Sequence, residues 1–189
     1  MPTRAQILKS GTPLALALPG CRFASRHGAV IDAPPELVWS VLHQLRWVDL
    51  RVSLVLCAVR GLGGRSASRR RLVDPPGPMT PIQQQPSRYL CSGQIGKPWT
   101  PRPVTGPAMQ DLDGLRAFTE PGWLKYGMEW TLTPLPGGRT FVETATLCEP
   151  TDEAAARRFA AYWQGIRVFS GLIRRDILAA LQRRVRCAG

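Results

Sequence analysis

The chain of 189 residues has the length of one ordinary domain, or of two small ones at most. Hydrophobic residues make up 44% of it and charged residues 20%, which excludes a wholly disordered or collagen-like chain. The net charge is +12, which raises the hypothesis of an RNA- or anionic-membrane-associated module acting through surface arginines. Because no aromatic residues alternate with the short arginine clusters, as base stacking requires, we expect a solvated arginine surface and no specific nucleic-acid partner.

The cysteines and the apolar segments bear on the compartment. The five cysteines lie far apart without a C-x-x-C motif, which predicts reduced thiols in a cytoplasmic protein and no metal site. Residues 14–21 end in a cysteine as a lipoprotein signal does, but their apolar run is too short for one. No stretch approaches the roughly 20 apolar residues of a membrane span, so no span is expected.

The first predicted element is a strand over residues 22–32, which follows an N-terminal extension over residues 1–21. The strand opens a single predicted domain over residues 22–187. Side chains alternate along a strand, so one face of this strand is expected to point inward. That face carries Phe23, Ser25, His27, Ala29 and Ile31.

Two short helices are predicted next. Pro34 and Pro35 suit the start of a helix over residues 36–45, because the first helical turn needs no backbone N–H. A second helix is predicted over residues 49–59, with an aspartate as its N-cap. Hydrophobic periodicity also allows residues 53–59 to form a buried strand.

The middle of the chain predicts antiparallel strands. Residues 61–81 read as a loop, residues 88–96 and 115–120 as strands, and the proline-rich residues 97–107 as irregular. Residues 124–132 alternate between large apolar and smaller or polar side chains. A Pro-Gly-Gly turn at 136–138 predicts a hairpin, and residues 140–149 form its returning strand.

The last predicted element is a helix from residue 151 to about residue 186. Acidic residues in its first turn and arginines in its last turn match the helix dipole. Its length, roughly 50 Å, requires it to lie across a sheet. Its apolar stripe is Phe159, Tyr162, Trp163, Ile166, Phe169, Ser170, Ile173, Ile177 and Leu181.

Three parts of this α+β pattern resemble the SRPBCC or START-like superfamily, which includes polyketide cyclase/dehydrase-like proteins. Residues 27–39 (HGAVIDAPPELVW) are similar to the family's entry strand and helix start. Residues 93–99 and 118–122 resemble segments of an uncharacterised bacterial branch. Residues 140–173 resemble that branch's last strand and closing helix.

The resemblance implies the helix-grip fold, in which a curved antiparallel sheet wraps around a long C-terminal helix, with two short helices after the first strand. In such proteins a cavity between sheet and helix holds a lipid-, sterol- or polyketide-like molecule, and some members are cyclases, aromatases or dehydratases. The chain departs from the branch at Ala145, where arginine is expected. It carries no well-known cyclase or lipid-transfer signature.

Glu143 and His27 are the candidates for acid–base chemistry. Alternation over residues 140–149 predicts that Glu143 points inward, where its carboxylate must be paired or protonated. We expect Arg167, His27 or a tyrosine as its hydrogen-bond partner. The sequence leaves open whether Glu143 forms a structural ion pair, holds a ligand or transfers a proton. It equally leaves open whether His27 is structural or a catalytic base.

Aromatic residues on the proposed inward faces supply the second signal. They fit either a packed core or the lining of a ligand pocket in which a few polar groups converge. The candidate ligand-binding residues are Tyr89, Trp99, Tyr126, Trp130, Phe141, Phe159, Tyr162, Trp163, Arg167 and Phe169.

The sequence therefore predicts binding of a hydrophobic or amphipathic, lipid- or polyketide-like small molecule in a cavity between the sheet and the C-terminal helix. The alternative is a cofactor-independent cyclase, dehydratase or lyase acting on such a molecule. No nucleotide-binding or nucleophile motif and no metal-ligand spacing is present in the sequence, so no cofactor is expected. Monomer and homodimer are both open.

Overall fold

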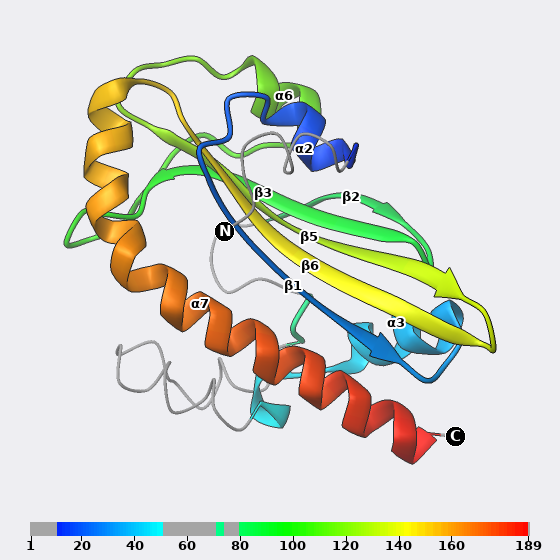
Figure 1. Ribbon diagram of the computed structural model, residues 1–189. Helices are drawn as coiled ribbons and strands as arrows, with labels where there is room; N and C mark the ends of the chain where they lie inside the picture. Colours follow the sequence, from blue (N-terminus) through cyan, green and yellow to red (C-terminus); the bar gives the residue numbers. More distant parts are fainter. Residues whose placement is uncertain (1–10, 51–70, 74–79, 189) are drawn as a thin grey trace.

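The computed structural model describes residues 11–50, 71–73 and 80–188, which form a curved antiparallel sheet with helices on both faces (Figure 1). The hydrogen-bonded order of the strands is β1-β6-β5-β3-β2, and β4 pairs with β3. This is the predicted α+β helix-grip fold. The strands are β1 (Phe23–Ile31), β2 (Thr80–Gln85), β3 (Tyr89–Lys97), β4 (Val104–Thr105), β5 (Leu124–Leu135) and β6 (Arg139–Pro150).

The central hairpin β5–β6 confirms the predicted pair of strands. Its register runs from Leu124 opposite Pro150 to Leu135 opposite Arg139. The turn between the strands needs two residues with positive φ, and Gly137 at +78° with Gly138 at +68° supply them.

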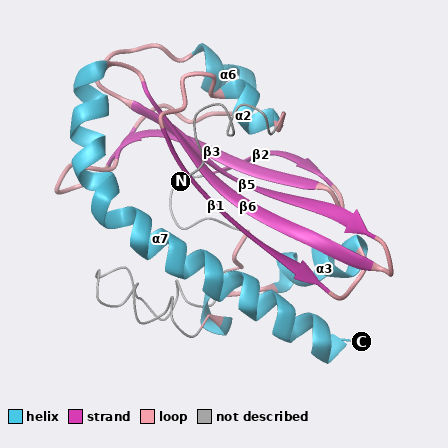
Figure 2. Cartoon of the chain, viewed as in Figure 1, coloured by secondary structure: helices cyan, strands magenta, loops and turns pink. Residues whose placement is uncertain are grey.

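The helix α7 (Glu153–Ala188) runs along one face of the sheet, which we call the α7 face (Figures 1 and 2). It packs on β1 and β6. Its first turn is capped by the Asp152 carboxylate, which accepts a hydrogen bond of 2.7 Å from the Ala155 amide. Thr151, the residue at which the predicted helix begins, instead accepts a hydrogen bond from the Trp123 amide.

The helix α3 (Pro35–Gln44) packs beside the C-terminal half of α7 and confirms the first of the two predicted short helices. Val38 and Leu42 of α3 join Ile177 and Leu181 of α7 in one buried apolar cluster. A 3-10 helix, η1 (Trp47–Asp49), follows α3. Of the predicted second helix over residues 49–59, the part from residue 51 on lies outside the described residues, as does the alternative strand over residues 53–59.

The opposite face of the sheet, which we call the α2 face, is covered by α2 (Pro13–Ala17) and α6 (Leu112–Ala117). Leu14 and Leu18 are fully buried there. The predicted strand over residues 115–120 is wrong, because α6 covers residues 115–117 and residues 118–120 are neither helix nor strand. The helix starts three residues earlier, where the Asp111 carboxylate accepts a hydrogen bond of 2.7 Å from the Gly114 amide.

Two short strands and the cysteines complete the comparison with the predicted elements. The sequence pattern did not predict β2, and β4 lies within the segment expected to be irregular.

Cys21, Cys91, Cys148 and Cys187 are free thiols. Among the described helices, none has both the length and the apolar character that a membrane crossing needs.

Candidate functional site

The centre of the α7 face is lined by β5 and β6. On β5, Met128 and Trp130 face α7, which confirms the alternation predicted for this strand. On β6, Thr144 and Thr146 face α7, because the hydroxyls of both accept hydrogen bonds from Arg174 of that helix. The register sets Met128 opposite Thr146 and Trp130 opposite Thr144, so apolar and hydroxyl side chains lie side by side here.

A pocket of ≈ 240 Å³ lies between the α7 face and α7, and we call it the sheet–helix pocket. One end is aromatic: the ring centroid of Phe159 lies 5.9 Å from that of Tyr162 and 5.6 Å from that of Trp163. Two to three turns further along α7, Ser170 and Arg174 make the other end polar. The remaining lining residues are Pro98, Leu124, Tyr126, Met128, Thr146, Cys148 and Ile166.

Arg174 is the only charged residue in the lining of the sheet–helix pocket within the described chain. It is 5% exposed, and its guanidinium donates hydrogen bonds to the hydroxyls of Thr144 and Thr146, the second at 2.7 Å. Its Cζ lies 5.8 Å from the centroid of the Trp130 ring. None of the ion pairs among the described residues involves it. Burial lowers the pKa of Arg174 to about 10, so the side chain is still a cation at neutral pH.

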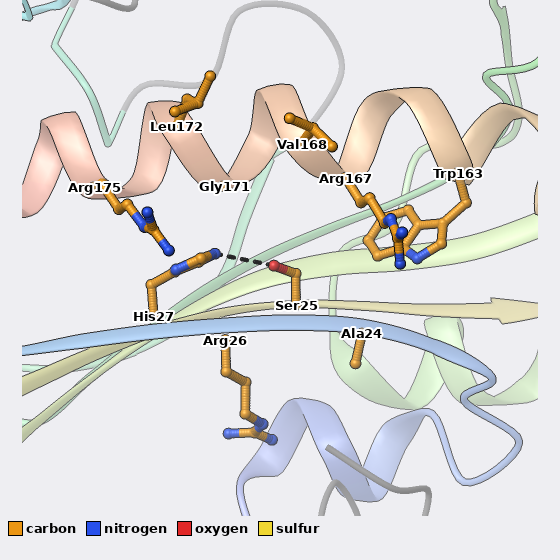
Figure 3. A pocket seen from close by; sticks show the side chains of 10 residues that line it. All are labelled: Ala24, Ser25, Arg26, His27, Trp163, Arg167, Val168, Gly171, Leu172 and Arg175. Carbon is orange, nitrogen blue, oxygen red and sulfur yellow. Dashed lines mark hydrogen bonds between the residues drawn. The ribbon is translucent and has the colours of Figure 1, made fainter. Parts of the chain in front are cut away.

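A second pocket, of ≈ 370 Å³, lies between β1 and α7, and we call it the β1 pocket (Figure 3). His27 and Ser25 point from β1 toward α7, and His27 Nε2 lies 3.1 Å from Ser25 Oγ. Trp163 reaches down from α7 and lines both pockets. Burial lowers the pKa of His27, and the positive charges of Arg174 and Arg175 lower it further, so the imidazole is neutral at pH 7.

The prediction that Glu143 points toward the C-terminal helix is wrong. Glu143 faces the other side of the sheet, where its Oε1 lies 2.6 Å from Arg26 Nη1. Figure 3 shows Arg26 pointing away from α7. His27 lies on the α7 face and Arg167 lines the β1 pocket, so neither is the partner of Glu143. Its side chain is 29% exposed, and it belongs to neither pocket.

Three aromatic residues that were predicted to bind the ligand also lie away from the sheet–helix pocket. Tyr89 is buried on the α2 face, where its hydroxyl donates a hydrogen bond of 3.0 Å to Glu129. Phe141 is 36% exposed and lies over Gly28, where an added Cβ would come within 2.6 Å of the ring. Phe169 is 39% exposed and lines neither pocket. For Tyr89 and Phe141 the error is one of phase, since a one-residue shift moves every side chain of a strand to the opposite face.

The other predicted ligand-binding residues do gather between sheet and helix. Trp99 packs against the aromatic end of the sheet–helix pocket, with its ring centroid 6.3 Å from that of Phe159. The role of this set in binding stays a prediction. Its members are Tyr126, Phe159, Tyr162 and Trp163 in the lining, Trp99 and Trp130 beside it, and Arg167 in the β1 pocket.

The α2 face also buries charged side chains, and these have partners. The Glu129 carboxylate, 1% exposed, accepts hydrogen bonds from the hydroxyls of Tyr89 at 3.0 Å and Thr12 at 3.1 Å. Burial raises the pKa of Glu129 above its ordinary value. Lys125 and Glu149 form a buried ion pair with an N–O distance of 2.6 Å. No cluster of three or more potential metal ligands occurs in the described part of the chain.

Arg174, Thr146 and Ser25 are among the polar residues of the two pockets that the sequence did not single out as site residues. A signal for Arg174 was present, because it lies four residues after Ser170 and three before Ile177, both in the predicted apolar stripe. An arginine inside an apolar stripe is a buried cation unless its side chain reaches the helix edge.

Comparison with known proteins gives structural matches alone. No protein-family model and no curated protein matches the chain. Protein MLL2253 from Mesorhizobium loti is 14% identical over 85% of this chain and 98% of its own, with a TM-score of 0.40. CalU16 from Micromonospora echinospora is 15% identical over 89% and 91%, with a TM-score of 0.33. The Zhui aromatase/cyclase from a Streptomyces species is 15% identical over 88% and 98%, with a TM-score of 0.33. At these values the likenesses carry no argument about function, which we take from the pockets.

Proposed function

We propose that the protein binds a hydrophobic or amphipathic small molecule in the sheet–helix pocket. The observation that carries this proposal is the composition of the pocket, which joins an aromatic end to a polar end that contains Ser170 and Arg174. Ligand pockets are mostly apolar, with a few polar groups that fix the orientation of the ligand. The volume of ≈ 240 Å³ lies below the roughly 300–1,000 Å³ of most such pockets, which favours a ligand of one or two rings over a sterol.

A structural role alone accounts poorly for these polar side chains. Between a helix and a sheet, apolar side chains of equal volume pack without a desolvation cost, whereas a buried charge is costly unless it has an opposite charge beside it. The C-terminal half of α7 packs through apolar side chains, since Ile177 and Leu181 are buried with α3 in a continuous core cluster. At the polar end of the sheet–helix pocket, polar and charged side chains occupy the equivalent positions.

The test combines a search for co-purified molecules with a titration. We expect native mass spectrometry of the purified protein to show a bound small molecule, and the stripped protein to bind the neutral aromatic amide 2-naphthamide in calorimetry. Ser170→Phe should block both, because Ser170 lines the pocket. Gln164→Phe is the matched control, because Gln164 is exposed on the same helix and should leave binding unchanged. Absence of both signals in the unmodified protein would refute the proposal.

A second candidate function is proton transfer to or from such a molecule, with His27 as general base. The observation that favours it is a neutral imidazole in the β1 pocket, hydrogen-bonded to Ser25 and close to Trp163, which both pockets share. Glu143 does not support this chemistry, since it lies outside both pockets. If the protein is an enzyme, His27→Gln should retain a co-purified compound that differs from the one in the unmodified protein in chromatographic retention, or in mass where the reaction eliminates water. The same compound in both proteins would leave binding as the function.

A further inference from the structure

We propose that Arg174 binds an acidic group, a carboxylate or a comparable organic anion, on the molecule held in the sheet–helix pocket. This inference rests on the proposed function and names the chemical class of its ligand. The aromatic body of the ligand would lie against Phe159 and Trp163, and its anion would lie at Arg174.

The first argument is the charge balance of the pocket. The described lining contains one arginine and no aspartate or glutamate. Thr144, Thr146 and the face of Trp130 surround the guanidinium, and they offer hydroxyl oxygens and a π system but no negative charge. Burial penalises a cation in such surroundings, and a bound anion would remove the penalty.

The second argument is the set of hydrogen-bond donors that remains. A guanidinium has five N–H donors, and hydrogen bonds to Thr144 and Thr146 engage two of them. Each threonine hydroxyl accepts from Arg174 and still has its own proton to donate. Thr146 lines the pocket, so its hydroxyl and the guanidinium can donate to the same carboxylate. Charge-assisted hydrogen bonds of this kind are about twice as strong as neutral ones.

The third argument is that the surrounding groups keep the guanidinium in place. The guanidinium donates hydrogen bonds to two threonines of β6, and the ring of Trp130 lies beside it. Long side chains of a helix point toward its N-terminus, which directs Arg174 toward Ser170 and the interior of the pocket. A guanidinium held in this way loses little conformational freedom when an anion binds.

The experiment compares two probes that differ in charge and share one ring system, 2-naphthoate and 2-naphthamide. We expect calorimetry to show that the unmodified protein binds the acid at least about tenfold more tightly than the amide. Arg174→Gln should weaken binding of 2-naphthoate by about tenfold or more and leave 2-naphthamide unchanged. Arg157→Gln is the matched control: it removes the same charge from an exposed position on the same helix that lines neither pocket, and it should preserve the preference.

The outcomes separate the two proposals. Equal affinity for the two probes, or a preference that survives Arg174→Gln, overturns the anion site and leaves the binding pocket standing. No binding of either probe overturns the anion site, and it overturns the pocket as well when native mass spectrometry shows no co-purified molecule. If Arg174→Gln does not fold, as judged by near-UV circular dichroism, Thr146→Val replaces it. That variant removes a hydroxyl donor from the pocket and should lower the affinity for 2-naphthoate alone.

Discussion

The two faces of the sheet bury charge in different ways. On the α2 face, Lys125 lies against Glu149, and Glu129 receives two hydroxyl hydrogen bonds with Arg26 at 3.8 Å. On the α7 face, Arg174 is as deeply buried as Lys125, but its partners are neutral hydroxyls and an aromatic ring. The same sheet therefore carries buried charges with partners of opposite charge on one side and, on the other, a cation that has no counter-charge among the described residues.

This difference helps to separate structural charges from functional ones. A buried ion pair with its hydrogen bonds satisfied adds little net stability, but each of its charges is neutralised by the other within the fold. A buried charge without a counter-charge keeps its desolvation cost, and a ligand of opposite charge can offset that cost. The α2 face holds a helix against the sheet through its buried groups, since Thr12 at the start of α2 bonds to Glu129. The α7 face instead leaves a pocket beside its cation.

The largest effect is expected from breaking the compensation on the α2 face. Lys125→Met leaves the Glu149 carboxylate buried without its cation, and the side chains of this pair are 6% and 11% exposed. We expect the free energy of unfolding to fall by about 3–5 kcal/mol, as for other buried pairs that lose one partner. Urea denaturation followed by tryptophan fluorescence measures it.

Two further variants check that burial is the cause. Arg22→Met breaks the exposed ion pair with Glu153, whose side chains are 46% and 70% exposed, and should cost less than about 1 kcal/mol. Adding Glu149→Met to Lys125→Met removes the orphaned charge and should restore part of the stability. Equal losses of unfolding free energy in Lys125→Met and Arg22→Met would show that water solvates the Lys125–Glu149 pair, so that neither charge depends on the other.

A smaller effect of opposite sign is expected at Arg174. Arg174→Met removes an uncompensated buried cation and keeps a flexible apolar side chain of similar length. We expect the free energy of unfolding of the ligand-free protein to stay equal or to rise, by up to about 4 kcal/mol. The hydroxyls of Thr144 and Thr146 can rotate toward other acceptors. A loss of several kcal/mol in the same urea experiment would mean that Arg174 is compensated within the fold, and the contrast between the two faces would disappear.

The asymmetry between the faces also explains which strands the sequence could predict. On β5, large side chains such as Tyr126 and Trp130 alternate with Lys125 and Glu129, and the α7 face follows from that contrast. On β6, apolar and small residues occupy both faces, because α7 covers one and α2 the other. Periodicity alone then fixes the strand and leaves its phase open, so Glu143 was placed on the wrong face.

The candidate site was predictable in part for the same reason. The apolar stripe predicted a shared face for Phe159, Tyr162 and Trp163, and all three line the sheet–helix pocket, because a helical face depends on local spacing. Their role in ligand binding stays a prediction. The partners of Arg174 come from β6, 28 and 30 residues away, and pairing over such a separation is a property of the tertiary fold. The packing of α2 on the sheet, which buries Glu129, could not be predicted either, because residues 14–21 resemble a lipoprotein signal with a short apolar run.

The smallest effect is expected at Glu129, as a change in pH dependence. Burial raises the pKa of Glu129 in the folded protein above 4.5, so over the window between that value and the folded pKa the folded state binds more protons than the unfolded state. Stability therefore falls as pH rises through that window and levels off above it. Glu129→Gln cannot titrate, so in urea denaturation its stability relative to the unmodified protein should increase as the pH rises above 4.5 and level off once Glu129 is ionised in the folded state. Glu153→Gln, at an exposed position, should show no such trend. Parallel pH profiles for Glu129→Gln and the unmodified protein would mean that Arg26 and the two hydroxyls compensate the carboxylate fully, which would widen the contrast with Arg174.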